Sequence, residues 1–335
     1  MFDEALLDDP VALLVRGATL EDLAGAGARL RRQQLESVTS TVDHLRAAGA
    51  DRPRAVVVLG AEARLVRSVT ELNATVPLIA WPMTALPAWV GPLDLVIVLA
   101  GRDSTWLTTC REATRRGALL VVAAASDSPL LDEISSVATV VSGGDDRFVT
   151  ALLMLKVLSG LGLGPVFDVS ALADELDRVA DLCGPRHGLG DNPAKSLACA
   201  VADTVPLLWG GSGLAARAAR RVGEALRRVT GQPALAGDAE ALLPLIERSA
   251  PRDVFTDPFE DDTGGANFTV LIFDDVDSEV DVGVRAQLVA AAARRRIRVE
   301  VITSASSCPV TRYSQLLQQG LYAAAYLELA TIDEA

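Results

Sequence analysis

The sequence is poor in the residues that bind metals. Among its 335 residues are two histidines and four cysteines, which are Cys110, Cys183, Cys199 and Cys308. The cysteines do not occur in the closely spaced pairs that hold zinc, and two histidines are too few to complete such a site. The sequence therefore predicts no metal site and gives no sign of a cofactor. The cysteines are expected to be free thiols of a cytosolic protein.

The chain also has few lysines, few aromatic residues and no long uncharged segment. Only Lys156 and Lys195 among 31 basic residues are lysines, and aromatic residues make up 4% of the chain. This bias is typical of a bacterial genome of high GC content. The net charge of −13 disfavours nucleic acids and anionic membranes as partners. No apolar run is long enough to span a membrane, and no signal peptide is recognised, so we expect a cytoplasmic protein.

Short apolar runs alternate with helical segments along the chain. In the first half they cover residues 54–60, 76–80, 93–101, 117–124 and 137–141, and in the second half 205–209, 233–236, 268–273 and 297–303. These runs are continuous rather than alternating, which is typical of strands buried on both faces. The pattern predicts an α/β fold in which helices cover both faces of a parallel sheet.

The two halves present these strands and helices in the same order, which predicts a duplicated, doubly wound domain. We expect an N-terminal helical segment (residues 1–49), a first domain (50–145), a helical linker (146–190) and a second domain with a C-terminal helix (191–335). Residues 251–266 are acidic and are predicted to form an exposed loop.

A glycine-rich turn is predicted between a strand and a helix in the second half. The turn contains Gly210, Gly211, Ser212 and Gly213. Free backbone N–H groups at the start of the helix, together with the serine hydroxyl, are suited to binding an anion or a sugar hydroxyl. The alternative is that the glycines only allow the helix and the strand to pack closely.

Four stretches carry a resemblance to a known family. They are Asp191-Asn-Pro-Ala-Lys-Ser-Leu-Ala198, Val205-Pro-Leu-Leu-Trp-Gly-Gly-Ser-Gly213, Ala218-Ala-Arg-Arg-Val222 and Tyr313-Ser-Gln-Leu-Leu-Gln-Gln-Gly-Leu-Tyr322. With the duplication, they resemble the sugar isomerase (SIS) domain family, and within it the bifunctional phosphoglucose/phosphomannose isomerases, including the TobH-like actinobacterial members. The resemblance implies two tandem SIS domains, a homodimer and a sugar phosphate as ligand.

Members of this family interconvert aldose and ketose 6-phosphates. A Ser/Thr-rich loop of the first domain holds the phosphate, a glutamate moves the proton between C1 and C2, and a histidine and a lysine assist ring opening. The resemblance places the substrate site at the two glycine-rich turns and beside an arginine that precedes the linker helix. The corresponding residues are Gly60, Gly101, Arg102, Ser104 and Thr105 in the first domain and Arg147 at the start of the linker.

Two residues are candidates for the catalytic roles. Glu240 falls near the family's glutamate, and His187 lies in the Gly/Pro-rich stretch 184–190. Asp277, Glu279 and Asp281 occupy the region of the family's histidine. The alternatives are a solvent-exposed glutamate in the first turn of a helix and an exposed linker histidine.

The candidate phosphate loop contains carboxylates as well as donors. The turn Gly60-Ala-Glu-Ala63 adds the carboxylate of Glu62. Asp103 repels a phosphate unless the positive charge of Arg102 or Arg147 offsets its negative charge. The alternative for this loop is a polar helix start that Asp103 or Ser104 caps.

Two hypotheses for the function follow. The first is an SIS-fold protein that binds a sugar phosphate with weak, altered or absent turnover. The second is a non-catalytic scaffold or regulator that keeps the fold. The donors around Gly101 and Arg147 discriminate between them.

Overall fold

The computed structural model describes residues 1–32, 35–71, 73–143, 146–249, 267–275 and 282–332. The predicted acidic loop at 251–266 and the carboxylates at 277, 279 and 281 lie outside these residues. The chain forms two compact units, which we describe separately. The first unit is Ala28–Ala173, and the second combines Met1–Gly27 with Asp174–Ala335. The domain boundaries predicted from the sequence stay a prediction.

The first unit contains a five-stranded parallel sheet with the strand order β2-β1-β3-β4-β5. Its strands are β1 (Val56–Gly60), β2 (Leu78–Trp81), β3 (Leu95–Gly101), β4 (Leu119–Ala125) and β5 (Thr139–Gly143). Its helices are α4 (Leu35–Ala47), α5 (Ala63–Thr70), the 3₁₀ helix η2 (Ser104–Trp106), α6 (Leu107–Arg115), α7 (Leu130–Ile134) and α8 (Arg147–Gly160). Helices α3 (Ala26–Arg32) and α9 (Val169–Leu182) cross the boundaries of the unit.

Helices cover both faces of this sheet, as the continuous apolar strands require. On one face Val57, Val96 and Val122 pack in a buried cluster with Cys110 of α6 and Ile134 of α7. Helices α4, α5 and α8 contact the strands as well as one another. The helix predicted as the start of a linker is α8, which is apolar because it contacts β3 and β5.

The second unit contains a four-stranded parallel sheet with the order β7-β6-β8-β9. Its strands are β6 (Val205–Gly210), β7 (Leu235–Ala236), β8 (Phe268–Asp275) and β9 (Arg298–Ser304). Its helices are the 3₁₀ helix η1 (Glu4–Leu7), α1 (Pro10–Arg16), α2 (Ala18–Ala24), α10 (Pro193–Val201), α11 (Gly213–Thr230), α12 (Ala239–Arg248), α13 (Val282–Arg294) and α14 (Pro309–Ala330).

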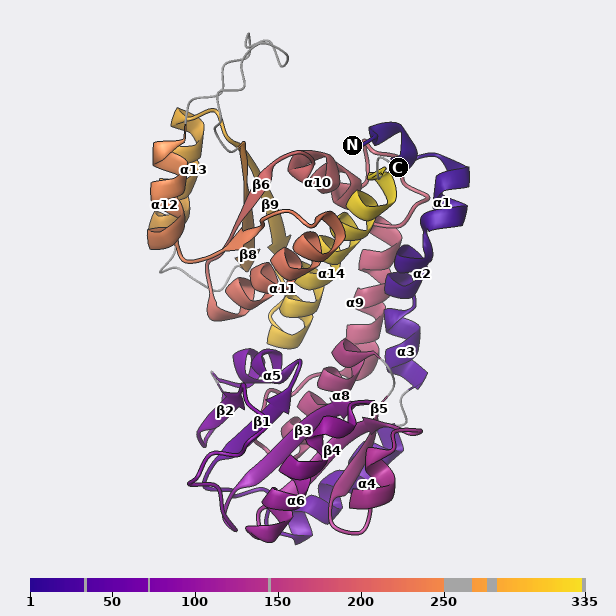
Figure 1. Ribbon diagram of the computed structural model, residues 1–335, viewed down its shortest axis with the longest axis vertical. Helices are drawn as coiled ribbons and strands as arrows, with labels where there is room; N and C mark the ends of the chain where they lie inside the picture. Colours follow the sequence, from indigo (N-terminus) through magenta and orange to yellow (C-terminus); the bar gives the residue numbers. More distant parts are fainter. Residues whose placement is uncertain (33–34, 72, 144–145, 250–266, 276–281, 333–335) are drawn as a thin grey trace. The chain divides into compact units, whose positions relative to one another are not determined.

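Two helix pairs enclose the second sheet (Figure 1). Helices α12 and α13 share a buried cluster with Leu207, Trp209 and Val270 of the strands, whereas α11 and α14 pack against each other and the strands. The last pair is close, because a Cβ on Gly320 of α14 would lie 2.3 Å from a methyl group of Val222 in α11.

The strand order confirms the predicted fold class. In both sheets the first strand has the second strand on one side and the third on the other, followed by the fourth. This is the doubly wound arrangement, in which the chain changes direction across the sheet between the first and third strands. The protein is therefore an α/β protein of two tandem parallel-sheet domains.

A buried lysine connects the beginning of the chain to the second unit. Lys195 is fully buried, and its ammonium donates to Asp8 Oδ1 at 2.6 Å and to the carbonyl of His187 at 2.8 Å. The ammonium also lies 5.2 Å from the ring centroid of Tyr326. Asn192 caps α10 through the N–H groups of Ala194 and Lys195, which confirms the predicted helix start. The lysine of the Asn-Pro-Ala-Lys stretch thus has a structural role.

Replacing Asp8 by alanine is expected to lower the free energy of unfolding by about 1–3 kcal/mol, because it leaves the buried Lys195 ammonium without its counter-charge. The value is below that of a fully buried pair because the Asp8 side chain is 51% exposed. The hydrogen bond from Lys195 lowers the pKa of Asp8 from its ordinary value of 3.8. The contribution of the Asp8–Lys195 ion pair to the free energy of unfolding is therefore complete above pH 3.8 and is lost as the pH falls through the folded-state pKa of Asp8.

Urea unfolding of the wild type, Asp8→Ala and the exposed control Glu21→Gln tests this expectation. Only Asp8→Ala should be destabilised at pH 7, and the difference in free energy of unfolding between this variant and the wild type should shrink on acidification. An equal loss in both variants would contradict the assignment.

Candidate functional site

The carboxyl edge of the first sheet brings most of the predicted binding residues together. Gly60 ends β1, Gly101 ends β3, and these neighbouring strands flank the point where the strand order reverses. In doubly wound folds this is the crevice where ligands bind. The loop after β3 adds Arg102, Ser104 and Thr105.

Gly60 is required by packing. Its φ angle is +108°, and a Cβ at this position would lie 2.4 Å from the carbonyl oxygen of Leu99 in β3. The strand end thus passes directly against the backbone of its neighbour, which only glycine permits. Glu62, at the N-cap of α5, is a buried carboxylate, with 3% of its surface exposed.

The loop after β3 contains one cation and one carboxylate, Arg102 and Asp103. Gly101 has a φ angle of +57°, Arg102 forms an ion pair with Asp127, and Asp103 caps η2 by accepting the N–H of Thr105 at 2.9 Å. The hydrogen bonds from the Thr105 side chain and backbone lower the pKa of Asp103, and the charge of Arg147 adds to the shift. The cap that the sequence offered as an alternative is therefore present.

Arg147 is the first residue of α8 and is exposed. Its neighbour Asp146 caps the helix through the N–H groups of Phe148 and Val149 and also accepts from Arg29 at 2.8 Å. The charge of Arg147 helps to lower the pKa of Asp103, so the two side chains are within electrostatic reach of each other. Arg147 and Ser104 are solvent-accessible donors at this edge.

In the second sheet, the glycine-rich turn is occupied by the chain's own groups. A Cβ on Gly210 would lie 2.2 Å from the backbone nitrogen of Ala216, so this glycine allows the strand to pass close to the start of α11. The Ser212 hydroxyl accepts the N–H of Ala215 at 3.0 Å and donates to Asp275 Oδ2 at 2.6 Å. Its hydrogen-bonding capacity is used within the protein, whereas Gly211 and Gly213 complete the turn.

Asp275 places a carboxylate where the α11 N-terminus favours an anion. It ends β8, is 2% exposed, and its Oδ1 accepts no hydrogen bond from the residues that the structure describes. The positive end of the α11 dipole stabilises this charge and would otherwise attract a phosphate. Asp275 is not among the residues predicted from the sequence; its signal there is a pair of aspartates at the end of an apolar strand.

A second polar contact at this edge was also missed. Ser304, at the end of β9, donates to Gln315 Oε1 at 2.5 Å, and Gln315 donates to Glu175 Oε2 at 2.9 Å. The neighbouring Asp274 pairs with Arg285 at 2.5 Å. These polar groups satisfy one another and connect the strand ends to α9, α13 and α14.

The two catalytic candidates lie at different ends of the second unit. Glu240 is exposed in the first turn of α12, which follows β7 at the carboxyl edge. The carbonyl of His187 accepts from Lys195, whose ammonium lies over Tyr326. Tyr326 lies near the C-terminal end of α14, about 25 Å along the helix axis from its first residue, and its neighbour Leu327 lines the pocket at the amino edge. His187 therefore lies toward the amino edge. The structure does not bring the two residues together.

Three of the four cysteines, Cys110, Cys183 and Cys199, are poor nucleophiles. Burial raises the pKa of the Cys110 thiol to about 11 and that of Cys183 to about 12, and burial is also the main cause of the shift of Cys199 to about 11. These thiols remain protonated at neutral pH. The described residues contain no cluster of three side chains suited to holding a metal ion, and within them no helix is long and apolar enough to cross a membrane.

Replacing Ser212 by alanine is expected to lower the free energy of unfolding by about 1–3 kcal/mol. The change removes the cap of α11 and deprives the buried Asp275 carboxylate of its donor. Ser212→Thr keeps the hydroxyl and should retain most of the stability. Thermal and urea unfolding of both variants measure the effect, and equal stability of the alanine variant and the wild type would show that the contact is not important.

Comparisons with known proteins agree with this architecture. Residues 190–333 match the family model described as the bacterial phospho-glucose isomerase C-terminal SIS domain. A search of curated protein sequences found no match to the chain.

Several solved structures share the fold. A glucose-6-phosphate isomerase like protein from Thermus thermophilus is 15% identical, with 96% of this chain and 92% of that chain covered and a TM-score of 0.57. The tagatose-6-phosphate ketose/aldose isomerase of Escherichia coli is 15% identical, with 93% of both chains covered and a TM-score of 0.61.

The C-terminal domain of glucosamine-fructose-6-phosphate aminotransferase from Francisella tularensis is 13% identical, with 94% of this chain and 97% of that chain covered and a TM-score of 0.61. Identities this low establish the fold alone. The chain is therefore a protein of the sugar isomerase (SIS) fold with two tandem domains, and its residues 190–333 resemble the C-terminal domain of bacterial phosphoglucose isomerase.

Proposed function

We propose that the protein binds a sugar phosphate, or a related carbohydrate derivative, at the carboxyl edge of its first sheet and isomerises it weakly or not at all. The observation that supports binding is the donor set around Gly101, where Arg102, Ser104 and Arg147 are all exposed. Guanidinium and hydroxyl groups are the usual ligands of a phosphate. The SIS fold, and the phosphosugar enzymes among the proteins that share it, agree with this ligand class.

Weak turnover follows from the available bases. Aldose–ketose isomerisation needs a base of suitable pKa within hydrogen-bond reach of the carbon acid. Asp103 is the carboxylate closest in sequence to the proposed phosphate donors, but its lowered pKa makes it a weak base. Glu240 and His187, the predicted catalytic residues, belong to the second unit and lie at opposite ends of it.

A specific observation favours the alternative, a scaffold or regulator that does not bind a sugar phosphate. Each carboxyl edge carries a carboxylate beside the start of a helix: Glu62 and Asp103 in the first unit and Asp275 in the second. These charges oppose a phosphate dianion. In the second unit the buried Asp275 carboxylate accepts from Ser212 and carries a negative charge at the helix start, so we assign no sugar phosphate to that edge.

The homodimer and the cytoplasmic location predicted from the sequence and the resemblance remain part of this proposal. Light scattering of the purified protein during size-exclusion chromatography tests the dimer.

The function is tested by calorimetric titration with glucose, mannose and fructose 6-phosphates, followed by a coupled isomerase assay. Arg147→Gln should weaken binding roughly fivefold, because it removes one charged donor. Asp103→Asn should strengthen binding by a similar factor at low ionic strength, because it removes the opposing charge, while asparagine still caps the helix. The assay is expected to show little or no turnover.

Arg111→Gln is a matched control, since Arg111 forms an exposed ion pair with Glu133 on the same unit. Inorganic phosphate, titrated in parallel, separates recognition of the phosphate from recognition of the sugar. If none of the three sugar phosphates releases or absorbs heat on titration at millimolar concentration, the proposed sugar-phosphate binding is wrong and the scaffold or regulator is favoured. Identical affinities of Asp103→Asn and the wild type would place the binding site elsewhere.

A further inference from the structure

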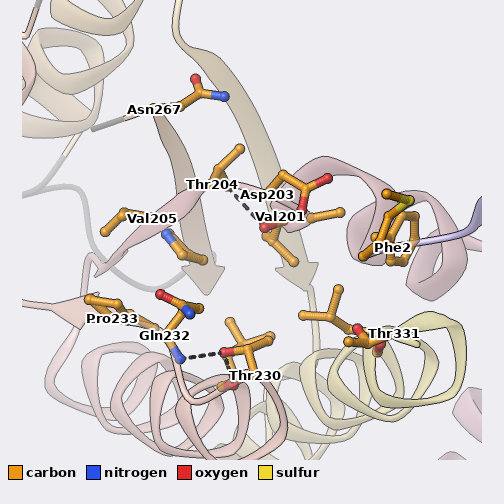
Figure 2. Close-up of a pocket in the computed structure, with 16 residues that line it drawn as sticks. Phe2, Val201, Asp203, Thr204, Val205, Thr230, Gln232, Pro233, Asn267 and Thr331 are labelled. Atoms are coloured by element: carbon orange, nitrogen blue, oxygen red, sulfur yellow. Dashed lines mark hydrogen bonds between the residues drawn. The ribbon is translucent and has the colours of Figure 1, made fainter. Parts of the chain in front are cut away.

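The second unit contains a pocket at the amino edge of its sheet, at the opposite end of the strands from the Gly210–Gly213 turn. Strand β6 begins beside it at Val205, and Asn267 directly precedes β8 (Figure 2). The six residues of β6 separate the two edges by roughly 17 Å. The cavity volume is about 520 Å³, which is within the range of small-molecule sites.

The inner wall of the pocket is apolar. Val201 at the end of α10, Leu226 of α11 and Leu327 of α14 are each at most 3% exposed, and Ala234 and Pro206 extend the same surface. Such a surface accommodates the C–H face of a ring.

The rim of the pocket is polar. Figure 2 shows Asp203 and Thr204 on one side, in the loop before β6, and Thr230 and Gln232 on the other, at and just after the end of α11. The hydroxyls of Thr204 and Thr230 donate to the backbone carbonyls of Val201 and Leu226 at 3.0 and 2.8 Å. The exposed groups that remain for a ligand are the amides of Gln232 and Asn267 and the carboxylate of Asp203.

The charge of the pocket determines the class of ligand. Asp203 is its one acidic side chain among the described residues that line it, and none of them has a basic side chain. The terminal ammonium of Met1, which also lines the pocket, donates to the carbonyl of Ile332 at 2.9 Å. In the part of the chain that the structure describes, Asp203 has no ion-pair partner, and its φ angle of +53° is in the left-handed region, which aspartate tolerates better than most residues. The Met1 ammonium is the one positive charge among the described lining residues, and its hydrogen bond goes to a neutral carbonyl. The unpaired Asp203 carboxylate beside an apolar wall therefore remains as a partner for a cation.

We propose that this pocket binds a hydroxylated organic monocation of about the size of a sugar, which is the chemistry of an amino sugar without a phosphate. The ammonium pairs with Asp203, the hydroxyls contact the Gln232 and Asn267 amides, and the apolar ring face lies on Leu226 and Leu327. This site is independent of the proposed phosphate site: it lies in the other unit and selects the opposite charge.

The test is calorimetric titration of the full chain with glucosamine, glucose and glucuronate, at a pH below the pKa of the glucosamine amine. Glucosamine should bind more tightly than glucose, and glucuronate should bind least. Asp203→Asn should reduce the affinity for glucosamine roughly fivefold and leave glucose unchanged, because asparagine keeps the polarity and the left-handed backbone but removes the charge. Gln232→Ala should weaken both neutral and cationic sugars.

Asp191→Asn is the matched control, because it removes an exposed carboxylate of the same unit that does not line the pocket. Circular dichroism and thermal unfolding establish that each variant is folded. Three results would overturn the proposal: no binding of glucosamine, equal effects of Asp203→Asn and Asp191→Asn, or tighter binding of glucuronate than of glucosamine. None of them depends on whether sugar phosphates bind to the first unit.

Discussion

The backbone N–H groups at the helix starts beside the carboxyl edges are the constraint on which the chemistry of this protein depends. A parallel sheet with helical crossovers places the strand ends and the starts of the following helices at one edge, where these N–H groups need acceptors. In many α/β proteins a phosphate supplies them. Here Asp103 accepts the N–H of Thr105, and Ser212 accepts that of Ala215 while donating to Asp275. The fold therefore keeps its binding geometry while part of the binding capacity is used by its own side chains.

Features that depend on neighbouring residues could be predicted from the sequence. Continuous apolar runs are sufficient to predict buried parallel strands, and the equal order of these runs in the two halves predicts the common strand order that both sheets have. The cap at Asn192 and the polar helix start at Asp103 also follow from a few adjacent residues. The glycine turn is a mixed case: Gly210 is explained by close packing, which was the alternative to a binding role.

Contacts between distant residues could not be predicted in this way. Ser212 and Asp275 are 63 residues apart, and Asp8 and Lys195 are 187 apart. Nothing in the local pattern shows that a serine in a glycine-rich turn has a buried carboxylate as partner, or that a lysine in a helix start is fully buried. The sequence therefore placed candidate residues at the carboxyl edge of the first sheet, but it did not reveal which hydroxyls and charges were already paired within the protein.

The duplicated fold has acquired different chemistry at its sheet edges. At the carboxyl edge of the first sheet, exposed arginines and Ser104 lie beside Asp103, so the balance of charge determines whether an anion binds. At the corresponding edge of the second sheet, Asp275 and Ser212 are paired, and the buried carboxylate excludes a second negative charge. The amino edge of that sheet instead has a roomy pocket, amide groups and one carboxylate. The described residues that line this pocket include no basic side chain, so Asp203 and the amides supply the polar contacts of the proposed site. The two proposed sites would let one scaffold bind an anion in one unit and a cation in the other without a change in topology.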